Sequence, residues 1–239
     1  TGYGDLRRYN TIILPSGNPD LSDYAKNMLM DWVKQGGTLI ANNRSTRSII
    51  SSDGMSSVKS LNSTFDESKS FNMDLMREIY SLEDNIDISD ANENKVDSKI
   101  TYPWESSDVT YSKEQLEMRD KWQSTLMPSG AIVSARADSE HWLTFGAEDV
   151  VPVLYGNYPI LMTGGNSLAA LRIGELIANK DSETKTINWS QIPSGYDLNV
   201  RMSGLVWPEA SQRIANSAYL TREKIGKGQI ILFSGEPNF

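Results

Sequence analysis

Apolar and polar positions follow two different periods over the first forty residues. Residues 9–14 form a short, mostly apolar run that ends at Pro15, which predicts a β-strand. From Leu21 to Val33 apolar residues recur three and four positions apart, so we expect a helix over 20–35 with Asp20 as its N-cap. Two glycines end this helix, and residues 38–41 form the next strand. This order predicts a βαβ unit with parallel strands.

The pattern weakens over residues 50–128. Serine is common there, and residues 81–101 are acidic and irregular. Residues 71–80 and 112–126 have helical spacing, and the second helix is expected to place Leu116, Arg119, Trp122 and Leu126 on one side. The segment has too few apolar residues for a core of its own, so we interpret 50–128 as a peripheral insertion into one domain spanning 1–239.

Regular patterns return in the last part of the chain. Residues 130–135 predict a strand, residues 150–154 and 159–162 a strand pair turned by Gly156-Asn157, and residues 209–216 a short helix. Residues 166–180 fit either a helix or a strand. Strands at 218–223 and 229–233 are joined by a hairpin turn, and the chain ends soon after the last strand, so we expect it to be a piece of a longer protein.

The most informative compositional feature is the absence of cysteine and the presence of one histidine, His141, in 239 residues. A Cys–His nucleophile pair is therefore impossible, as is a zinc site built from cysteines or from two histidines. We expect no cofactor in this segment. His141 is either a general base or lone ligand, or a loop histidine bonded to a backbone carbonyl, and the absence of a partner favours the second.

The net charge of −8 is concentrated in one segment. Residues 50–125 hold 16 Asp and Glu against 8 Lys and Arg, and the rest of the chain holds 15 against 15. This distribution argues against nucleic acid as a partner, because nucleic-acid binding requires a basic surface. No apolar run approaches the roughly 20 residues of a membrane-spanning helix, so we expect no membrane span.

Four segments together resemble one protein family: Tyr9–Gly17, Trp32–Ala41, His141–Gly146 with Val151–Leu154, and Ser203–Phe239. They are similar to the class I glutamine amidotransferase-like domain that follows the catalytic domain in bacterial zinc carboxypeptidase-like proteins. The resemblance implies a flavodoxin-like α/β fold with a mainly parallel central sheet flanked by helices. It also implies a secreted or periplasmic protein, with zinc held by the parent's catalytic domain, which would be the partner of this segment.

The expected binding edge lies beyond the carboxyl ends of the parallel strands, where open α/β sheets bind ligands. Its candidate residues are Gly17, Asn18, Asn43, Arg44 and Glu236. The resemblance places an amidotransferase nucleophile on the turn after strand 38–41, where this chain has Asn43. It places the active-site His and Glu near the last strands, where this chain has Glu236 and no His. Arg44 is the single cation of the set, so a small anionic ligand such as a carboxylate is expected.

These observations predict a non-catalytic accessory domain of a larger, peptidase-like protein, with a structural or ligand-binding role and a degenerate active site. Two alternatives remain open. One is a hydrolase that uses Ser45 or carboxylates in the same cleft. The other is a carbohydrate-binding module, which is suggested by the 6 Trp and 10 Tyr residues.

Overall fold

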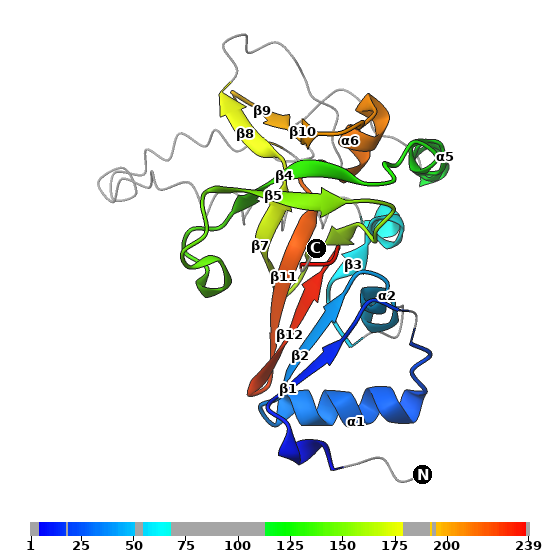
Figure 1. Ribbon diagram of the computed structural model, residues 1–239. Coiled ribbons are helices and arrows are strands. Elements are labelled where there is room, and N and C mark those ends of the chain that lie inside the picture. Colours follow the sequence, from blue (N-terminus) through cyan, green and yellow to red (C-terminus); the bar gives the residue numbers. More distant parts are fainter. Residues whose placement is uncertain are drawn as a thin grey trace, which may run out of the picture.

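The computed structural model in Figure 1 describes residues 5–17, 19–50, 55–67, 113–178, 192 and 195–237. Its elements, in chain order, are η1 (Leu6–Arg8), β1 (Thr11–Leu14), α1 (Asp23–Lys34), β2 (Thr38–Asn42), α2 (Ser45–Ile50), β3 (Lys59–Ser60), η2 (Leu61–Glu67), α5 (Lys113–Ser124), β4 (Ala131–Ala137), η3 (Trp142–Thr144), β5 (Val150–Tyr155), β6 (Leu161–Met162), β7 (Ser167–Ile173), β8 (Glu175–Ala178), β9 (Tyr196–Asn199), β10 (Arg201–Ser203), α6 (Pro208–Ile214), β11 (Ala218–Ile225) and β12 (Gly228–Phe233).

Most of the strands form one mixed sheet in the order β1-β2-β12-β11-β7-β4-β10. β5 also pairs with β4, and β6 pairs with both β11 and β3, while β8 and β9 form a separate two-stranded sheet. The β1–β2 and β2–β12 pairs are parallel, and the other pairs of named strands are antiparallel. The predicted α/β class is confirmed. The sheet is mostly antiparallel, however, and the expected parallel arrangement is limited to β1, β2 and β12.

The predicted βαβ unit is confirmed at the parallel edge, where α1 lies below β1 and β2 in Figure 1. Leu29, Trp32 and Val33 form the buried face of α1. The predicted cap is wrong: the helix begins at Asp23, and the hydroxyl of Ser22, not Asp20, accepts a hydrogen bond from the Ala25 N–H at 3.3 Å. Ser22 is three residues before the amide that it caps, which is the spacing an N-cap requires.

The predicted β11–β12 hairpin is also confirmed, and its turn is joined to the end of α1. The Lys227 N–H donates to the Lys34 carbonyl at 3.0 Å, and the Gln229 N–H donates to the Gly37 carbonyl at 3.1 Å. A methyl group at Gly228 would collide with the backbone carbonyls of Val33 and Gly37. Glycine is therefore required here by close backbone approach.

The predicted pairing of residues 150–154 with 159–162 is wrong. β5 pairs along its length with β4, and β6 pairs with β11 and β3 instead. The turn signal at Gly156-Asn157 marks the exit from β5 but does not determine which strand comes next to it. Within the stretch 166–180, which fitted either a helix or a strand, residues 167–173 form β7 and residues 175–178 form β8.

The described ends of the predicted insertion pack onto the sheet. Val58 and Leu61 are buried, and β3 extends the sheet through β6. The buried carboxylate of Glu223 on β11 accepts hydrogen bonds from the Ser56 hydroxyl at 2.6 Å and from the Ser57 N–H at 2.8 Å. Residues 55–65 are therefore part of the core and not peripheral as expected. The helix predicted at 71–80 and the acidic stretch at 81–101 lie outside the described residues.

The helix predicted at 112–126 is present as α5, but its buried face differs from the prediction. Trp122 is 58% exposed, whereas Asp120 and Gln123 are buried. The Asp120 carboxylate accepts two hydrogen bonds from the Arg213 guanidinium on α6, at 2.7 and 3.3 Å. Leu116 of the predicted face does pack against the core, so the prediction was wrong for Trp122 and missed the buried ion pair that joins the two helices.

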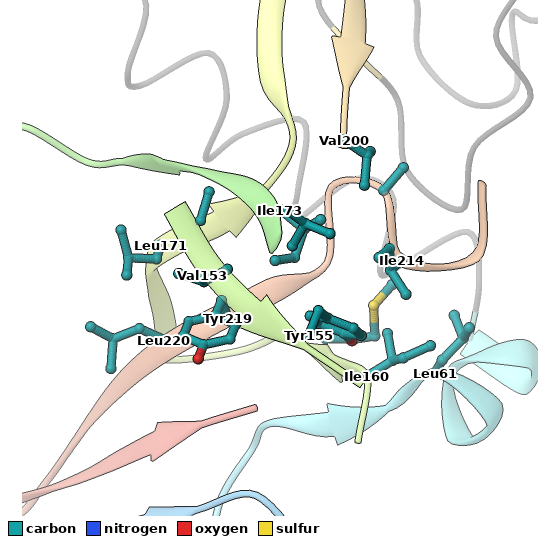
Figure 2. Close-up of a cluster of buried hydrophobic side chains, with 14 of the residues drawn as sticks. Leu61, Val153, Tyr155, Ile160, Leu171, Ile173, Val200, Ile214, Tyr219 and Leu220 are labelled. Carbon is teal, nitrogen blue, oxygen red and sulfur yellow. The ribbon is translucent and has the colours of Figure 1, made fainter. Parts of the chain in front are cut away.

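Buried apolar side chains form two clusters on opposite faces of the sheet. Leu39, Ile230 and Leu232 pack with α1 in one cluster. Ile231, next to them on β12, belongs to the other cluster, because successive side chains of a strand point to opposite faces. Figure 2 shows part of this second cluster, where Tyr155, Ile214 and Leu61 bring together β5, α6 and η2.

Candidate functional site at the ends of the parallel strands

Asn43 forms the turn between β2 and α2. Its φ of 49° lies in the left-handed region, which asparagine tolerates better than most residues. The Asn43 N–H donates to the Phe233 carbonyl of β12 at 3.0 Å. The Asn43 carbonyl accepts from the Thr46 N–H at 3.1 Å and from the Thr46 hydroxyl at 2.6 Å. The turn is thus fixed to the neighbouring strand on one side and to α2 on the other.

Asn43 and Glu236, which are far apart in the sequence, meet at this edge. The Asn43 side-chain amide donates from Nδ2 to Oε1 of Glu236 at 3.3 Å. Asn43 is 7% exposed, and its Oδ1 has no hydrogen-bond partner. Glu236 is half-buried, and its backbone carbonyl accepts from the Tyr219 hydroxyl at 3.5 Å. The structure therefore brings together two of the predicted site residues, one after β2 and one after β12.

The other predicted site residues are placed less closely. Gly17 is half-buried in the loop after β1, and Asn18 lies outside the described residues. Arg44 is exposed, and no ion pair holds it among the residues that the structure describes. The loop after β1 is tied to α2 by the Ser45 hydroxyl, which donates to the Pro15 carbonyl. Arg44 is thus a solvent-facing cation beside the Asn43–Glu236 pair.

Two tyrosines that the sequence did not indicate complete this edge. Tyr158 and Tyr219 lie against Gly235, where a methyl group would come within 2.7 Å of the Tyr219 hydroxyl and 3.1 Å of the Tyr158 ring. Gly235 thus lets both rings approach the residue before Glu236. Tyr158 also contacts Tyr155, with ring centroids 5.7 Å apart. Tyr158 was missed because it lies in a loop, and Tyr219 because the predicted hairpin does not by itself indicate that its hydroxyl reaches Glu236.

Burial governs the ionisation of these phenols. Burial raises the pKa of Tyr158, and the charge of Glu236 raises it further. Burial likewise raises the pKa of Tyr219, with smaller contributions from Tyr158, Tyr155 and Glu236. The pKa of Tyr155 rises to about 12, chiefly because of burial. All three hydroxyls therefore remain protonated at neutral pH and do not act as bases, and the Tyr219 hydroxyl donates to the Glu236 carbonyl.

Neither Ser45 nor His141 is available as a nucleophile or base at this edge. Ser45 is completely buried, and its hydroxyl is committed to the Pro15 carbonyl. His141 lies on the loop after β4, where it caps η3: its Nδ1 accepts from the Leu143 N–H at 3.1 Å. The expected bond to a backbone carbonyl is therefore replaced by a bond from a backbone amide. Within the described residues, no three His, Cys, Asp or Glu side chains are grouped to hold a metal ion.

A shallow depression lies at the opposite end of the parallel strands. Trp32 lines it from α1, and its Nε1–H donates to the Tyr9 carbonyl just before β1 at 3.0 Å. The remaining lining residues come from η1 and α1: Asp5, Leu6, Arg7, Met28, Asp31 and Gln35. The depression is therefore separate from the predicted binding edge.

Comparison of the chain with protein-family models, with curated proteins and with solved structures finds no match. In the part of the chain that the structure describes, no helix has the length and apolarity needed to cross a membrane.

Proposed function

We propose that this chain is a non-catalytic accessory domain, of the class I glutamine amidotransferase-like type, in a larger zinc carboxypeptidase-like protein. Its partner would be the catalytic domain of the same parent chain, in a secreted or periplasmic setting. The flavodoxin-like relationship is supported by the β1–α1–β2 unit and by β12, which lies parallel to β2. The sequence segments quoted for the resemblance include this unit and β12.

The observation that carries the proposal is the identity of the residue on the strand-to-helix turn. Asn43 occupies a left-handed, buried position after β2, where the resemblance would place a catalytic cysteine. A carboxamide is not a nucleophile, and its Nδ2 is already bonded to Glu236. This arrangement supports a domain that keeps the strand-to-helix turn of the family but lacks its nucleophile.

The geometry argues against the serine-hydrolase alternative. A nucleophilic serine needs an exposed hydroxyl with a base within hydrogen-bond reach. The Ser45 hydroxyl is buried against a backbone carbonyl, and the single histidine of the chain is on another loop.

The edge could serve as a binding site for a small carboxylate. Arg44 is exposed and would supply a planar, permanently charged partner for such a group. Glu236 and the tyrosine hydroxyls beside it would limit the ligand to one with its own hydrogen-bond donors and acceptors. These features support a retained binding role but do not require one.

The test is to assay the purified chain against glutamine and against a C-terminal peptide substrate, with and without added zinc. We expect no turnover. Activity that persists through purification and is lost in Glu236→Gln would overturn the proposal, because a contaminating enzyme would be unaffected by that substitution. In parallel, a titration with acetate followed by NMR should shift the Arg44 resonances in the native chain, and Arg44→Gln should abolish the response.

A further inference from the structure

The chain between β4 and β5, which we call the aromatic loop (Asp138–Asp149), is held by internal hydrogen bonds. The Asp138 carbonyl accepts from the His141 N–H at 3.2 Å and from the Thr144 hydroxyl. The His141 carbonyl accepts from the Thr144 N–H at 3.0 Å, and the Thr144 carbonyl accepts from the Ala147 N–H at 2.9 Å. These consecutive hydrogen bonds within the loop fix its backbone conformation before any partner binds.

The loop displays two aromatic side chains to solvent. Trp142 is 55% exposed and Phe145 is 94% exposed, whereas Leu143 between them packs against the core. One side of Trp142 is stacked on the His141 ring, with centroids 6.1 Å apart and an angle of 25° between the planes. The loop therefore folds by hydrogen bonding and leaves its largest apolar surfaces uncovered. Exposed aromatics on a preorganised support are typical of protein interfaces.

The ionised side chains within the loop itself have one sign, while Arg222 on β11 is a cation whose charge acts on His141. Between residues 138 and 149 the chain has four carboxylates, Asp138, Glu140, Glu148 and Asp149, and neither lysine nor arginine. The last three are exposed. In Figure 1 the loop, in green, projects from the left edge of the sheet beyond β7, where a partner could reach it. An apolar centre with an acidic rim favours a partner that carries the opposite charge.

We propose that the aromatic loop is a docking site for a basic segment of a partner protein, one that presents arginine or lysine side chains. A guanidinium would lie over the free side of Trp142, since cations are attracted to the face of an indole ring. The aliphatic part of the same side chain would cover Phe145, and the exposed carboxylates would pair with neighbouring cations. This inference does not depend on the binding edge described above.

The same features disfavour two other occupants. A second copy of this loop would bring four carboxylates against four others. An anionic membrane surface would be repelled by the same charges, although Trp and Phe alone would suit a membrane interface. A basic protein segment satisfies both the aromatic pair and the acidic rim.

The experiment uses a labelled oligo-arginine peptide as the probe and a Gly/Ser peptide of equal length as the neutral control. Binding to the 239-residue chain is measured by fluorescence anisotropy. We expect the double variant Trp142→Ala/Phe145→Ala to bind oligo-arginine at least about tenfold more weakly while keeping every charge. Trp122→Ala on α5 is the matched control, because Trp122 is 58% exposed and distant in sequence, and it should leave binding unchanged.

Each other outcome overturns the proposal. Equal binding by the double variant would assign the peptide to the acidic segment 50–125 or to general charge attraction. Equal binding of the Gly/Ser peptide would show that the partner need not be basic. If the double variant lost self-association but bound the peptide unchanged, the aromatics would be assigned to contact with a second copy. If it lost binding to phosphatidylcholine vesicles but bound the peptide unchanged, they would be assigned to a membrane. Circular dichroism of each variant confirms that the fold is retained.

Discussion

The parallel edge of the sheet and its antiparallel part differ in how far apart in sequence their contacts are. In the parallel edge, β1, α1 and β2 follow one another along the chain and pack together, and only β12 is contributed from elsewhere. In the antiparallel part, β4 pairs with β10 and β7 with β11, and in both pairs other elements lie between the two partners in sequence. Local patterns thus describe most of the first region, whereas the second combines local pairs, β4–β5 and β11–β12, with these long-range pairs.

The two regions also bury different kinds of groups. The cluster under α1 contains apolar side chains from α1, β2 and β12, together with apolar residues of α2, β6, β7 and β11. The antiparallel part also buries charged residues with defined partners: Glu223 bonded to Ser56 and Ser57, and Asp120 bonded to Arg213. Apolar periodicity identifies the first type of contact and misses the second. The comparison teaches that a buried polar partner can replace an apolar stripe as the link between elements.

The largest expected effect tests the apolar side of this comparison. Trp32→Ala should lower the free energy of unfolding by about 3–5 kcal/mol, because it leaves a cavity under η1 and β1 and removes the bond to the Tyr9 carbonyl. Urea denaturation measures the change. Asn27→Ala, on the exposed side of α1, is the control and should change stability by less than about 0.5 kcal/mol. A loss below about 1 kcal/mol for Trp32→Ala would show that this helix face contributes little.

Much of the parallel edge could be predicted because its signals are local. The apolar spacing of α1 identified Leu29, Trp32 and Val33 as buried, and an equally local signal, the hairpin turn, identified the antiparallel β11–β12 pair at its border. The meeting of Asn43 with Glu236 followed from a topological rule, since parallel strands end at the same edge. The error in this region was one of detail: Asp20 was predicted as the N-cap of α1, whereas Ser22 is the N-cap.

The rest could not be predicted because it depends on which distant strands become neighbours. The pairing of β6 with β11 and β3 has no local sequence signal. The position of Tyr219 beside Glu236 depends on the β11–β12 register, and that of Tyr158 on the path of the chain after β5. The face of α5 was predicted in part: Leu116 packs against the core, but Trp122 is exposed, and the burial of the polar Asp120 is explained only by the position of Arg213.

The second prediction tests the polar link. Arg213→Ala should lower the free energy of unfolding by about 3 kcal/mol, because it leaves the Asp120 carboxylate buried without its partner. The double variant Asp120→Leu/Arg213→Met should recover most of this loss, since apolar residues can replace a buried ion pair. Thermal unfolding of the three proteins gives the comparison. If the double variant is as unstable as the single one, the α5–α6 contact depends on more than this pair.

The third prediction concerns the junction of the two regions. Gly228→Ala should cost about 2–3 kcal/mol, because the added methyl would overlap backbone carbonyls at the end of α1, which cannot rotate away as a side chain can. Gly164→Ala is a matched control, since no atom lies within 4 Å of the added methyl there, and its effect should be small. Hydrogen exchange would show whether α1 or β11 loses protection first. Equal stability of the two variants would contradict the close packing at Gly228.

The smallest expected effect is a pH dependence in the antiparallel part. Burial lowers the pKa of His141; Asp138 opposes this shift and Arg222 adds to it. The folded state therefore prefers the neutral ring, whose Nδ1 accepts from the Leu143 N–H. Above the ordinary histidine pKa of about 6.5 both states are neutral, so nothing is lost. As the pH falls below about 6.5, the unfolded chain binds a proton first, and stability declines until the folded ring is also protonated.

His141→Asn separates this titration from the cap, because asparagine can accept the same backbone hydrogen bond but does not ionise. Urea denaturation at about pH 8 and pH 5 should show the native chain losing more stability than the variant on acidification, because only the native chain has the His141 ring to protonate. His141 is the single histidine, so its contribution in this interval is distinguishable. If the native chain gained stability relative to the variant at low pH, the Asp138 charge would raise the pKa of His141 by more than burial lowers it.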